Sequence, residues 1–404
     1  MPHVLLIVPT QTYRASDFLE AAAELGIDLS VASEEELPLV AADRRIWINC
    51  TRPEWSARTL ADHAARLPID AIVPLDDQGV VVAARAAQLI GLPHNPPAGA
   101  AATRNKAMLR RRLAQDEISQ PRFGIIERGD CPSEIAAELG YPVVFKPLSR
   151  SGGQGVIRVD RASDADAAAR RIRRILAGAG ENPNQPILAE EFLPGGEVAV
   201  EGLLSRGRLK ILAVFDKPGA PQGPYFEETV LIAPSRLPDD ILGEIDHLAR
   251  RTVTTLGLRE GPIHAEFRIG RDRVSVLEVA ARSIGGLCSR SLRFGLMAES
   301  WESLILRQAL GMEMPSVVRQ PGATGVMMLP IPRSGRLVEV EGAGEARDTP
   351  GITGLEITIP PGGEVKALPD GDRYLGFLFA AAPHPSAVEH ALKQAFSRLR
   401  VIIG

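Results

Sequence analysis

The first stretch that could carry chemistry is a lysine followed by a glycine-rich loop. Val144-Phe145-Lys146 leads into Ser151-Gly152-Gly153-Gln154-Gly155. A lysine at a strand end places its ammonium where the loop begins, and small residues let backbone N–H groups approach an anion such as phosphate. The Gly-Lys-Ser/Thr ending of a Walker A loop is missing and a strand follows, so an ordinary hairpin turn explains this stretch alone at least equally well.

A second candidate is an acidic stretch that follows a later strand. The run Glu190-Glu191-Phe192-Leu193 is followed by Glu197. An extended segment of this kind can offer backbone N–H and C=O groups to an adenine edge, and a carboxylate can accept hydrogen bonds from both ribose hydroxyls. A solvated acidic turn is the simpler explanation when this stretch is taken by itself.

Two carboxylates occur in mainly apolar segments that alternate like neighbouring antiparallel strands. Glu266 lies in His264-Ala265-Glu266-Phe267, and Glu278 lies in Leu277-Glu278-Val279. A carboxylate in such a strand is costly unless it is paired or bound to a cation. Two that converge from paired strands can hold Mg²⁺, with phosphate oxygens and water as the other ligands. Glu266 and Glu278 are therefore the candidate metal ligands.

Arg282 lies shortly after Glu278 and opens the loop Ser283-Ile284-Gly285-Gly286. A guanidinium beside a glycine turn can bind a transferring phosphoryl group or a substrate carboxylate, which makes Arg282 the candidate catalytic residue. A buried salt bridge between Glu278 and Arg282 is the alternative.

Other residues are candidates for contact with substrate or phosphate. Lys217 leads into a Gly- and Pro-rich loop of the type that often borders active sites, although a plain surface loop fits equally well. Gly285 and Gly286 are included because their amides can face an anion. His264 is included too, but we expect a hydrogen-bonded strand histidine there rather than a proton carrier.

Composition narrows the class of protein. The chain has 404 residues and 45% hydrophobic content, which suits a large core and two or three domains. A net charge of −4 makes nucleic acid a poor partner, and the basic segments at 110–112 and 170–174 are expected to be solvated helix faces. The three scattered cysteines favour a cytoplasmic compartment. No apolar run approaches the roughly 18 residues of a membrane span.

Hydrophobic patterns predict the elements that position these residues. Apolar strands at 4–8, 29–32, 45–48 and 71–75 and a helix at 79–90 form an open α/β unit. No GxGxxG follows the first strand, so a dinucleotide site is not expected. After a Pro-rich linker at 93–97, one helix is predicted over about 103–115, including Lys106. Near the end, Ser386 and Glu389 predict a capping box for a helix.

The order of these elements resembles the ATP-grasp superfamily over roughly residues 1–310. That order is a helix lysine, a strand lysine, a glycine loop, a Glu-rich hinge, two strand carboxylates and an arginine. The resemblance implies a nucleotide held between two α+β subdomains behind an N-terminal domain. It implies that Lys106 and Lys146 hold phosphates, Glu190, Phe192 and Leu193 line the adenine hinge, Glu197 holds the ribose, and Glu266 and Glu278 bind Mg²⁺.

Within that superfamily the chain looks most like the L-amino acid ligases. The resemblance rests on 264–267, on 278–286, and on a tail containing 329–335 and 374–377, which is similar to the C-terminal domain of that group. One position departs from the pattern, because Ala280 stands where the superfamily usually has an Asn two residues after the second metal carboxylate. A water can replace that ligand, so the number of metal ions, one or two, stays open.

The resulting expectation is a chain of α/β and α+β domains. These are a Rossmann-like pre-ATP-grasp domain at 1–97, an ATP-grasp domain of two α+β subdomains at 98–311 with a small lid subdomain at about 120–190, and a small C-terminal α+β domain at 312–404. Loops such as 219–228 and 283–293 would shape the substrate pocket.

The expected function is ATP-dependent joining of a carboxylate to an amine through an acyl phosphate. ATP and Mg²⁺, or Mn²⁺ in its place, are the expected cofactors. The expected partners are small amino-acid-like molecules, with a homodimer as a candidate assembly. An ATP-grasp carboxylase that activates bicarbonate and a nucleotide-binding protein that has lost catalysis are the alternatives.

Overall fold

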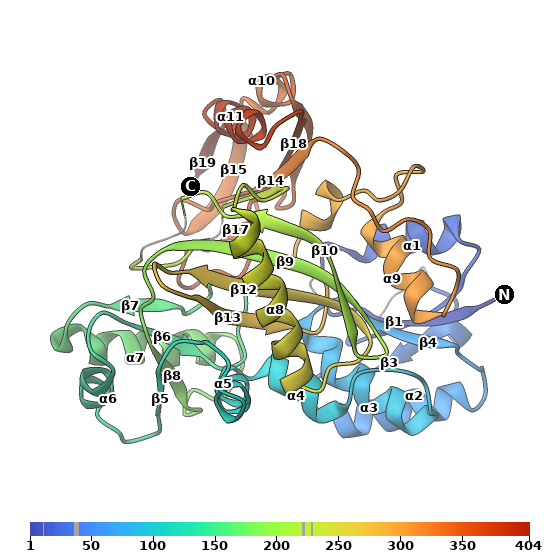
Figure 1. Cartoon of the computed structure of the whole chain (residues 1–404), viewed down its shortest axis with the longest axis horizontal. Coiled ribbons are helices and arrows are strands. Elements are labelled where there is room, and N and C mark those ends of the chain that lie inside the picture. Colours follow the sequence, from blue (N-terminus) through green and yellow to red (C-terminus); the bar gives the residue numbers. More distant parts are fainter. Residues whose placement is uncertain (11, 36–39, 220–222, 228) are drawn as a thin grey trace.

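The computed structural model describes residues 1–10, 12–35, 40–219, 223–227 and 229–404 (Figure 1). The chain opens with a parallel four-stranded sheet in the order β3-β2-β1-β4. Its elements are β1 (His3–Ile7), α1 (Ala15–Glu24), β2 (Asp28–Ser33), β3 (Arg45–Trp47), α2 (Pro53–Ala64), β4 (Ala71–Pro74) and α3 (Val80–Ile90).

The apolar run of β1 serves two cores at once. Val4 and Leu6 pack in the cluster that contains Phe18 of α1, whereas Leu5 and Ile7 pack in the cluster that contains Leu60 of α2. Side chains of a strand alternate between faces, so a continuous apolar run is needed where helices cover both. The predicted α/β unit is therefore confirmed.

A second four-stranded sheet has the order β5-β8-β6-β7 and forms the lobe with α6 and α7 in Figure 1. Its β6-β7 pair is an antiparallel hairpin that carries the glycine loop, so the hairpin interpretation is correct and does not exclude an anion at the same loop. Two helices precede it. The elements are α4 (Pro97–Arg104), α5 (Lys106–Gln115), β5 (Phe123–Ile126), α6 (Pro132–Leu139), β6 (Val143–Pro147), β7 (Ile157–Val159), α7 (Ala162–Gly178) and β8 (Ile187–Glu191).

The largest sheet has eight strands in the order β13-β12-β9-β10-β11-β14-β18-β16. Helix α8 packs against β13 and β10, and α11 packs against β14 and β18. The elements are β9 (Gly196–Ser205), β10 (Arg208–Asp216), β11 (Val230–Ala233), α8 (Asp239–Thr255), β12 (Gly261–Ile269), β13 (Val274–Ala280), α9 (Trp301–Ala309), β14 (Ala323–Leu329), β16 (Ile352–Ile357), β18 (Gly376–Ala382) and α11 (Pro385–Phe396).

The C-terminal residues extend that sheet, because β14 pairs with β11. They also form a small sheet in the order β17-β15-β19. Its strands are β15 (Gly335–Glu341), β17 (Glu364–Val365) and β19 (Arg400–Ile403). Helix α10 (Ala343–Arg347) packs against β16 and α11. The mixture of parallel and antiparallel sheets with helices confirms the predicted fold class, while the boundaries at 97 and 311 stay predictions.

Two local predictions were wrong. The helix expected over 103–115 is broken at Asn105, whose extended backbone ends α4 and whose side chain accepts a hydrogen bond from Met108 N at the start of α5. The expected capping box is not formed, because α11 begins at Pro385 and has no side-chain cap. Glu389 pairs instead with Lys393 and Arg236. Neither of these cations lies in the first turn of α11, and they bind the Glu389 carboxylate in place of the backbone N–H at the helix start.

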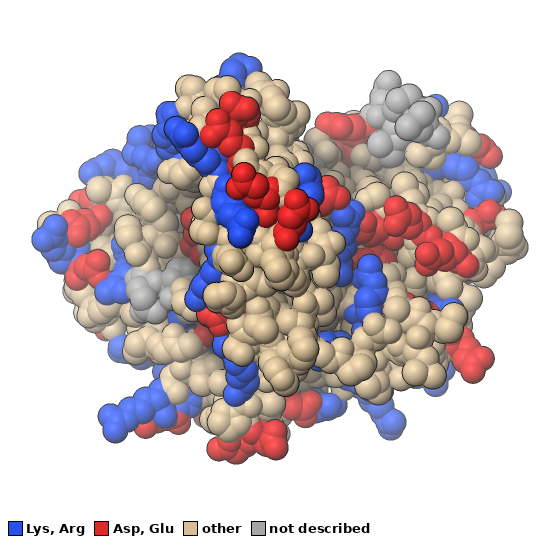
Figure 2. All heavy atoms as spheres, turned by 90° about the horizontal axis from the view of Figure 1, so that it is seen from above, with Lys and Arg blue, Asp and Glu red and all other residues tan. Residues whose placement is uncertain are grey.

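The distribution of charged side chains on the surface agrees with the net charge of −4. On the face shown in Figure 2, Lys and Arg side chains are interspersed with Asp and Glu. Among the described residues, no helix has both the length and the apolar character needed to cross a bilayer.

Candidate active site

The predicted site residues converge on one cleft of about 980 Å³. Its wall contains all of them except Lys217, whose Nζ lies 2.7 Å from Glu197 and 2.9 Å from Glu266. The wall also includes residues from the N-terminal sheet region and from the C-terminal residues around Tyr374. The predicted residues in the wall are Lys106, Lys146, Ser151, Gly152, Gly153, Glu190, Glu191, Phe192, Leu193, Glu197, His264, Glu266, Glu278, Arg282, Gly285 and Gly286.

Glu190, which lies on β8 in the wall of the cleft, is held between two cations. Lys146 Nζ lies 2.6 Å from one of its carboxylate oxygens, and Arg110 Nε donates to the other at 2.5 Å. The side chain of Glu190 is 2% exposed. Glu190 therefore places the Lys146 ammonium at the cleft wall, where a phosphate can compete for it.

Arg110 corrects the sequence-based expectation for the basic segment 110–112. Arg111 and Arg112 are exposed as predicted, but Arg110 is buried and also donates to the carbonyls of Val276 and Leu277. The sequence did contain a sign that Arg110 is buried. Arg110 lies three residues from both Ala107 and Leu113, so it shares one face of α5 with these two buried apolar residues.

Replacing Arg110 tests this buried pairing. Arg110→Met should lower the free energy of unfolding by about 2 kcal/mol, below the 3–5 typical of a broken buried pair, because Lys146 still faces Glu190. Arg111→Met, one position along the same helix, should stay within about 0.5 kcal/mol of wild type. Urea unfolding measures both. Equal stability of the two variants would contradict the pairing.

The pH dependence of stability provides a second test of Glu190. Burial alone would raise its pKa, but the charges of Arg110 and Lys146 lower the pKa to about 2, from a reference of 4.5. A lowered pKa adds stability above the unfolded value that is lost as the pH falls. Wild type should therefore lose unfolding free energy more steeply than Glu190→Gln between about pH 4.5 and 3. Parallel curves in urea titrations would refute this assignment.

Glu266 and Glu278 lie directly opposite each other on β12 and β13. Glu266 pairs with Lys217, and Glu278 lies 3.1 Å from Lys106 Nζ, which also donates to the Arg150 carbonyl at 2.6 Å. Carboxylate oxygens suit Mg²⁺. In the described part of the chain, no group of three or more His, Cys, Asp or Glu side chains is arranged to hold a metal ion. The pair therefore fits a metal whose remaining ligands are phosphate and water.

His264 is a strand histidine whose two ring nitrogens both have hydrogen-bond partners, in agreement with the prediction. Its Nδ1 lies 2.6 Å from Glu201 and its Nε2 lies 3.2 Å from Glu266. Burial alone would lower its pKa, but the hydrogen bonds with the two carboxylates raise the pKa to about 9. Glu201 was missed, although it is a carboxylate in an apolar strand like Glu266. It also accepts hydrogen bonds from Ile284 N and Trp301 Nε1.

Arg282 does not form the salt bridge with Glu278 that was the alternative. Its Nη2 donates to Asp77 at 2.8 Å, and its Nε lies 3.9 Å from Asp76. Although burial opposes it, the charges of Asp77 and Asp76 raise the pKa of Arg282 above its usual range. The N-terminal sheet thus supplies two site residues that the sequence did not reveal, directly after the apolar end of β4.

The glycine loop is hydrogen-bonded to residues 369 and 370 of the C-terminal region. Gly155 N donates to the Pro369 carbonyl at 2.9 Å, and Gln154 Nε2 donates to the Asp370 carbonyl at 2.7 Å. Gly153 has φ of 73°, and a Cβ there would lie 2.5 Å from the Phe226 carbonyl oxygen, so glycine is required. Of the predicted substrate loop 219–228, residues 220–222 and 228 lie outside the described residues.

Comparison with known proteins agrees with this arrangement. The family model for the ATP-grasp N-terminal domain matches residues 19–94, that for the ATP-grasp domain matches 139–291, and that for L-amino acid ligase C-terminal domain 2 matches 327–404. The crystal structure of L-amino acid ligase from Bacillus licheniformis has a TM-score of 0.81 and 24% identity, and covers 100% of this chain and 99% of that one. This likeness shows the fold.

Two curated relatives match part of the chain. The protein y4rH of Sinorhizobium fredii is 27% identical over 72% of this chain and 59% of its own length. The alanine–anticapsin ligase of Bacillus subtilis is 27% identical over 55% of this chain and 50% of its own length. The chain thus spans about half the length of such relatives. The three family models occur in chain order along one fold, and the chain belongs to the ATP-grasp superfamily, with a C-terminal domain of the L-amino acid ligase type.

Proposed function

We propose that this protein is a ligase that uses ATP to join the carboxylate of one amino-acid-like molecule to the amine of another. The observation that carries the proposal is the meeting of Lys106, Lys146 and Arg282 with the paired Glu266 and Glu278 in one cleft. Positioned cations and carboxylates suit phosphoryl transfer, which needs charge stabilisation more than an enzyme nucleophile.

In the proposed reaction the γ-phosphoryl group of ATP passes to the substrate carboxylate, which gives an acyl phosphate and ADP. The amine then attacks the acyl carbon and phosphate leaves. Lys106 and Lys146 would bind phosphates, and Arg282 with the amides of Gly285 and Gly286 would stabilise the charged intermediate. Mg²⁺ held by Glu266 and Glu278 would neutralise the phosphate oxygens.

The remaining residues would bind the nucleotide and exclude water. The adenine would lie along the hinge of Glu190, Glu191, Phe192 and Leu193, and Glu197 would accept the ribose hydroxyls. The loop 151–155 would close over the phosphates, since free acyl phosphate hydrolyses. Its hydrogen bonds to Pro369 and Asp370 support closure against the C-terminal residues. We also propose that the chain is divided into domains at residues 1–97, 98–311 and 312–404.

Amino-acid-like substrates are supported by the C-terminal match and by the names of the relatives, which include ligases of L-amino acids and of alanine. The test is trapping of acyl phosphates by hydroxylamine across a panel of amino and organic acids with ATP and Mg²⁺. A hydroxamate should form with at least one amino acid. Absence of hydroxamate with every acid would reject the ligase proposal, and phosphate release that depends on bicarbonate alone would indicate a carboxylase.

A further inference from the structure

Arg14 is a buried cation that the proposed reaction does not use. It directly precedes α1, is 1% exposed and lies 3.3 Å from Glu302 of α9, which is also buried. Removing two charges from water is expensive, and packed apolar side chains often stabilise a core at least as well as a buried ion pair. Stability alone is therefore a weak reason for an arginine at this position.

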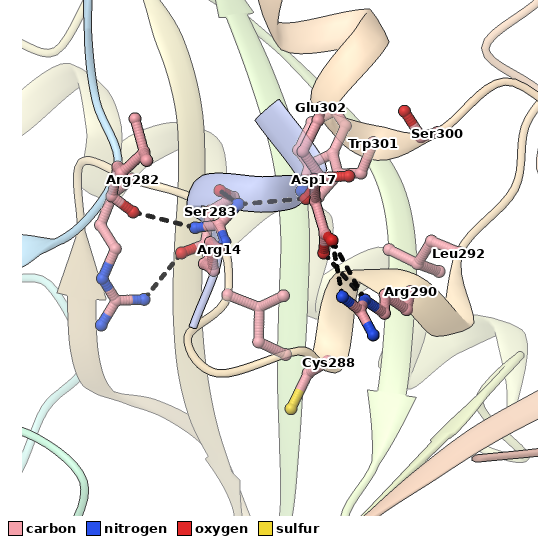
Figure 3. A network of polar contacts seen from close by, with 12 residues as sticks. Arg14, Asp17, Arg282, Ser283, Cys288, Arg290, Leu292, Ser300, Trp301 and Glu302 are labelled. Carbon is pink, nitrogen blue, oxygen red and sulfur yellow. Dashed lines mark hydrogen bonds and ion pairs between the residues drawn. The ribbon is translucent and has the colours of Figure 1, made fainter. Parts of the chain in front are cut away.

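Arg14 contacts two chain segments that lie next to the Arg282 side chain. Figure 3 shows Arg14 beside Ser283 and Arg282. Arg14 Nη1 donates to the Leu75 carbonyl at 3.1 Å, and Arg14 Nη2 donates to Ser283 Oγ at 2.6 Å. Leu75 directly precedes Asp76 and Asp77, and Ser283 directly follows Arg282. One planar guanidinium thus holds both backbone segments whose side chains form the Arg282–Asp77 pair.

We propose that Arg14 is a positioning residue that sets the direction of the Arg282 guanidinium, an inference that rests on the role of Arg282 in the proposed function. Arg282 Nη1 donates to the carbonyl of Ser283, and Nη2 donates to Asp77. Both acceptors belong to segments that Arg14 ties together. If Arg14 is lost, the two segments can separate and Arg282 shifts; a displacement of about 1 Å can reduce a rate by about 100-fold.

The planar guanidinium of Arg14 can donate hydrogen bonds in two fixed directions, and the positioning of Arg282 depends on this property. A lysine would keep the charge opposite Glu302, but a single ammonium on a flexible stem cannot reproduce two fixed hydrogen bonds in different directions. Arg14→Lys should therefore separate positioning from charge. The double variant Arg14→Met/Glu302→Gln removes both charges together, so that neither is left buried alone if Arg14→Lys folds poorly.

Arg290 provides a matched control. It pairs with Asp17 of the same helix α1 at 2.8 Å (Figure 3). It also pairs with Glu356 at 3.0 Å. It therefore ties α1 to the same chain segment as Arg14 does, but it lies beyond the Ser283-Gly286 turn. Although Arg290 belongs to the segment 283–293 that was expected to shape the substrate pocket, it does not line the cleft. Arg290→Gln weakens the contact between these regions without touching either neighbour of Arg282.

The experiment measures hydroxamate formation, nucleotide affinity and melting temperature for wild type, Arg14→Lys, Arg14→Met/Glu302→Gln and Arg290→Gln. Both Arg14 variants should lose about tenfold or more in kcat, within the range for a misplaced group, while nucleotide Kd stays within about twofold. Arg290→Gln should keep kcat within about twofold and change only the melting temperature. Near-normal kcat in both Arg14 variants, or an equal loss in Arg290→Gln, would overturn the inference.

A spectroscopic readout keeps this test separate from the proposed function. The ¹⁵Nε–¹Hε signal of Arg282, identified by its loss in Arg282→Lys, should shift and broaden in both Arg14 variants and stay unchanged in Arg290→Gln. If wild type forms no hydroxamate with any acid, the ligase proposal fails, and this signal alone decides whether Arg14 positions Arg282. An unchanged signal in the Arg14 variants would reject the positioning role.

Discussion

Arg282→Ala should form acyl phosphate about 10²–10³ times more slowly than wild type, with little change in nucleotide affinity. Arg282 lines the same cleft as the Gly285-Gly286 turn and the adenine hinge proposed at 190–193. Loss of one preorganised group that stabilises developing charge typically costs about 3 kcal/mol in the barrier. Hydroxamate formation under single-turnover conditions measures the chemical step, and equilibrium binding of an ATP analogue measures affinity.

The control for Arg282→Ala addresses its structural partner. Removing Arg282 leaves Asp77 with a weaker ion pair to Arg104, which lies 3.4 Å away. Arg282→Ala/Asp77→Asn removes the charge left without its main partner, so it should regain stability without regaining turnover. Near-normal turnover in Arg282→Ala would remove Arg282 from the catalytic role, and recovered turnover in the double variant would show that the loss was structural.

Glu278→Gln should weaken metal binding by more than about 100-fold. That is the upper range for losing a group that only supports a metal ligand, and a direct carboxylate ligand should matter more. Glu278 lies opposite Glu266, so each carboxylate would supply oxygen to the same ion. Binding of Mn²⁺ in the presence of a non-hydrolysable ATP analogue, followed by electron paramagnetic resonance, gives the affinity and the number of ions.

Two further variants sharpen the metal test. Glu266→Gln should show a loss of the same order as Glu278→Gln, because both carboxylates would supply oxygen to the same ion. Asp246→Asn, in a surface pair with Arg250 on α8, removes one negative charge elsewhere and should leave Mn²⁺ affinity unchanged. Equal weakening by Asp246→Asn would mean that net charge rather than ligation controls binding. Unchanged affinity in both glutamate variants would place the metal elsewhere.

Sequence patterns predicted the elements and many of the residues that line the cleft, because these features depend on local sequence. Strand alternation, helical spacing and glycine loops are local properties, and Lys146, Glu266 and Glu278 each occupy a position that local patterns define. The convergence of the two carboxylates followed from strand pairing. Because β12 and β13 are adjacent in sequence, the register that places Glu266 opposite Glu278 could be anticipated.

The contacts that the sequence did not reveal join residues far apart in the chain. Arg282 pairs with Asp77 and Arg110 pairs with Glu190, and neither partner shows any local sign of the other. The same holds for the glycine loop, whose partners Pro369 and Asp370 lie in the C-terminal residues. Such pairs depend on how separate helices, sheets and loops dock, which hydrophobic periodicity does not encode. Glu201 differs, because its burial in an apolar strand was a local signal that was overlooked.

The most direct test of the central claim follows oxygen atoms from the acid to phosphate. An acid that forms a hydroxamate is labelled with ¹⁸O in both carboxylate oxygens and incubated with ATP, Mg²⁺ and an amine. If the reaction passes through an acyl phosphate, each inorganic phosphate released should carry one ¹⁸O atom and the amide product should keep the other. Unlabelled phosphate accompanying labelled amide would contradict the proposed route.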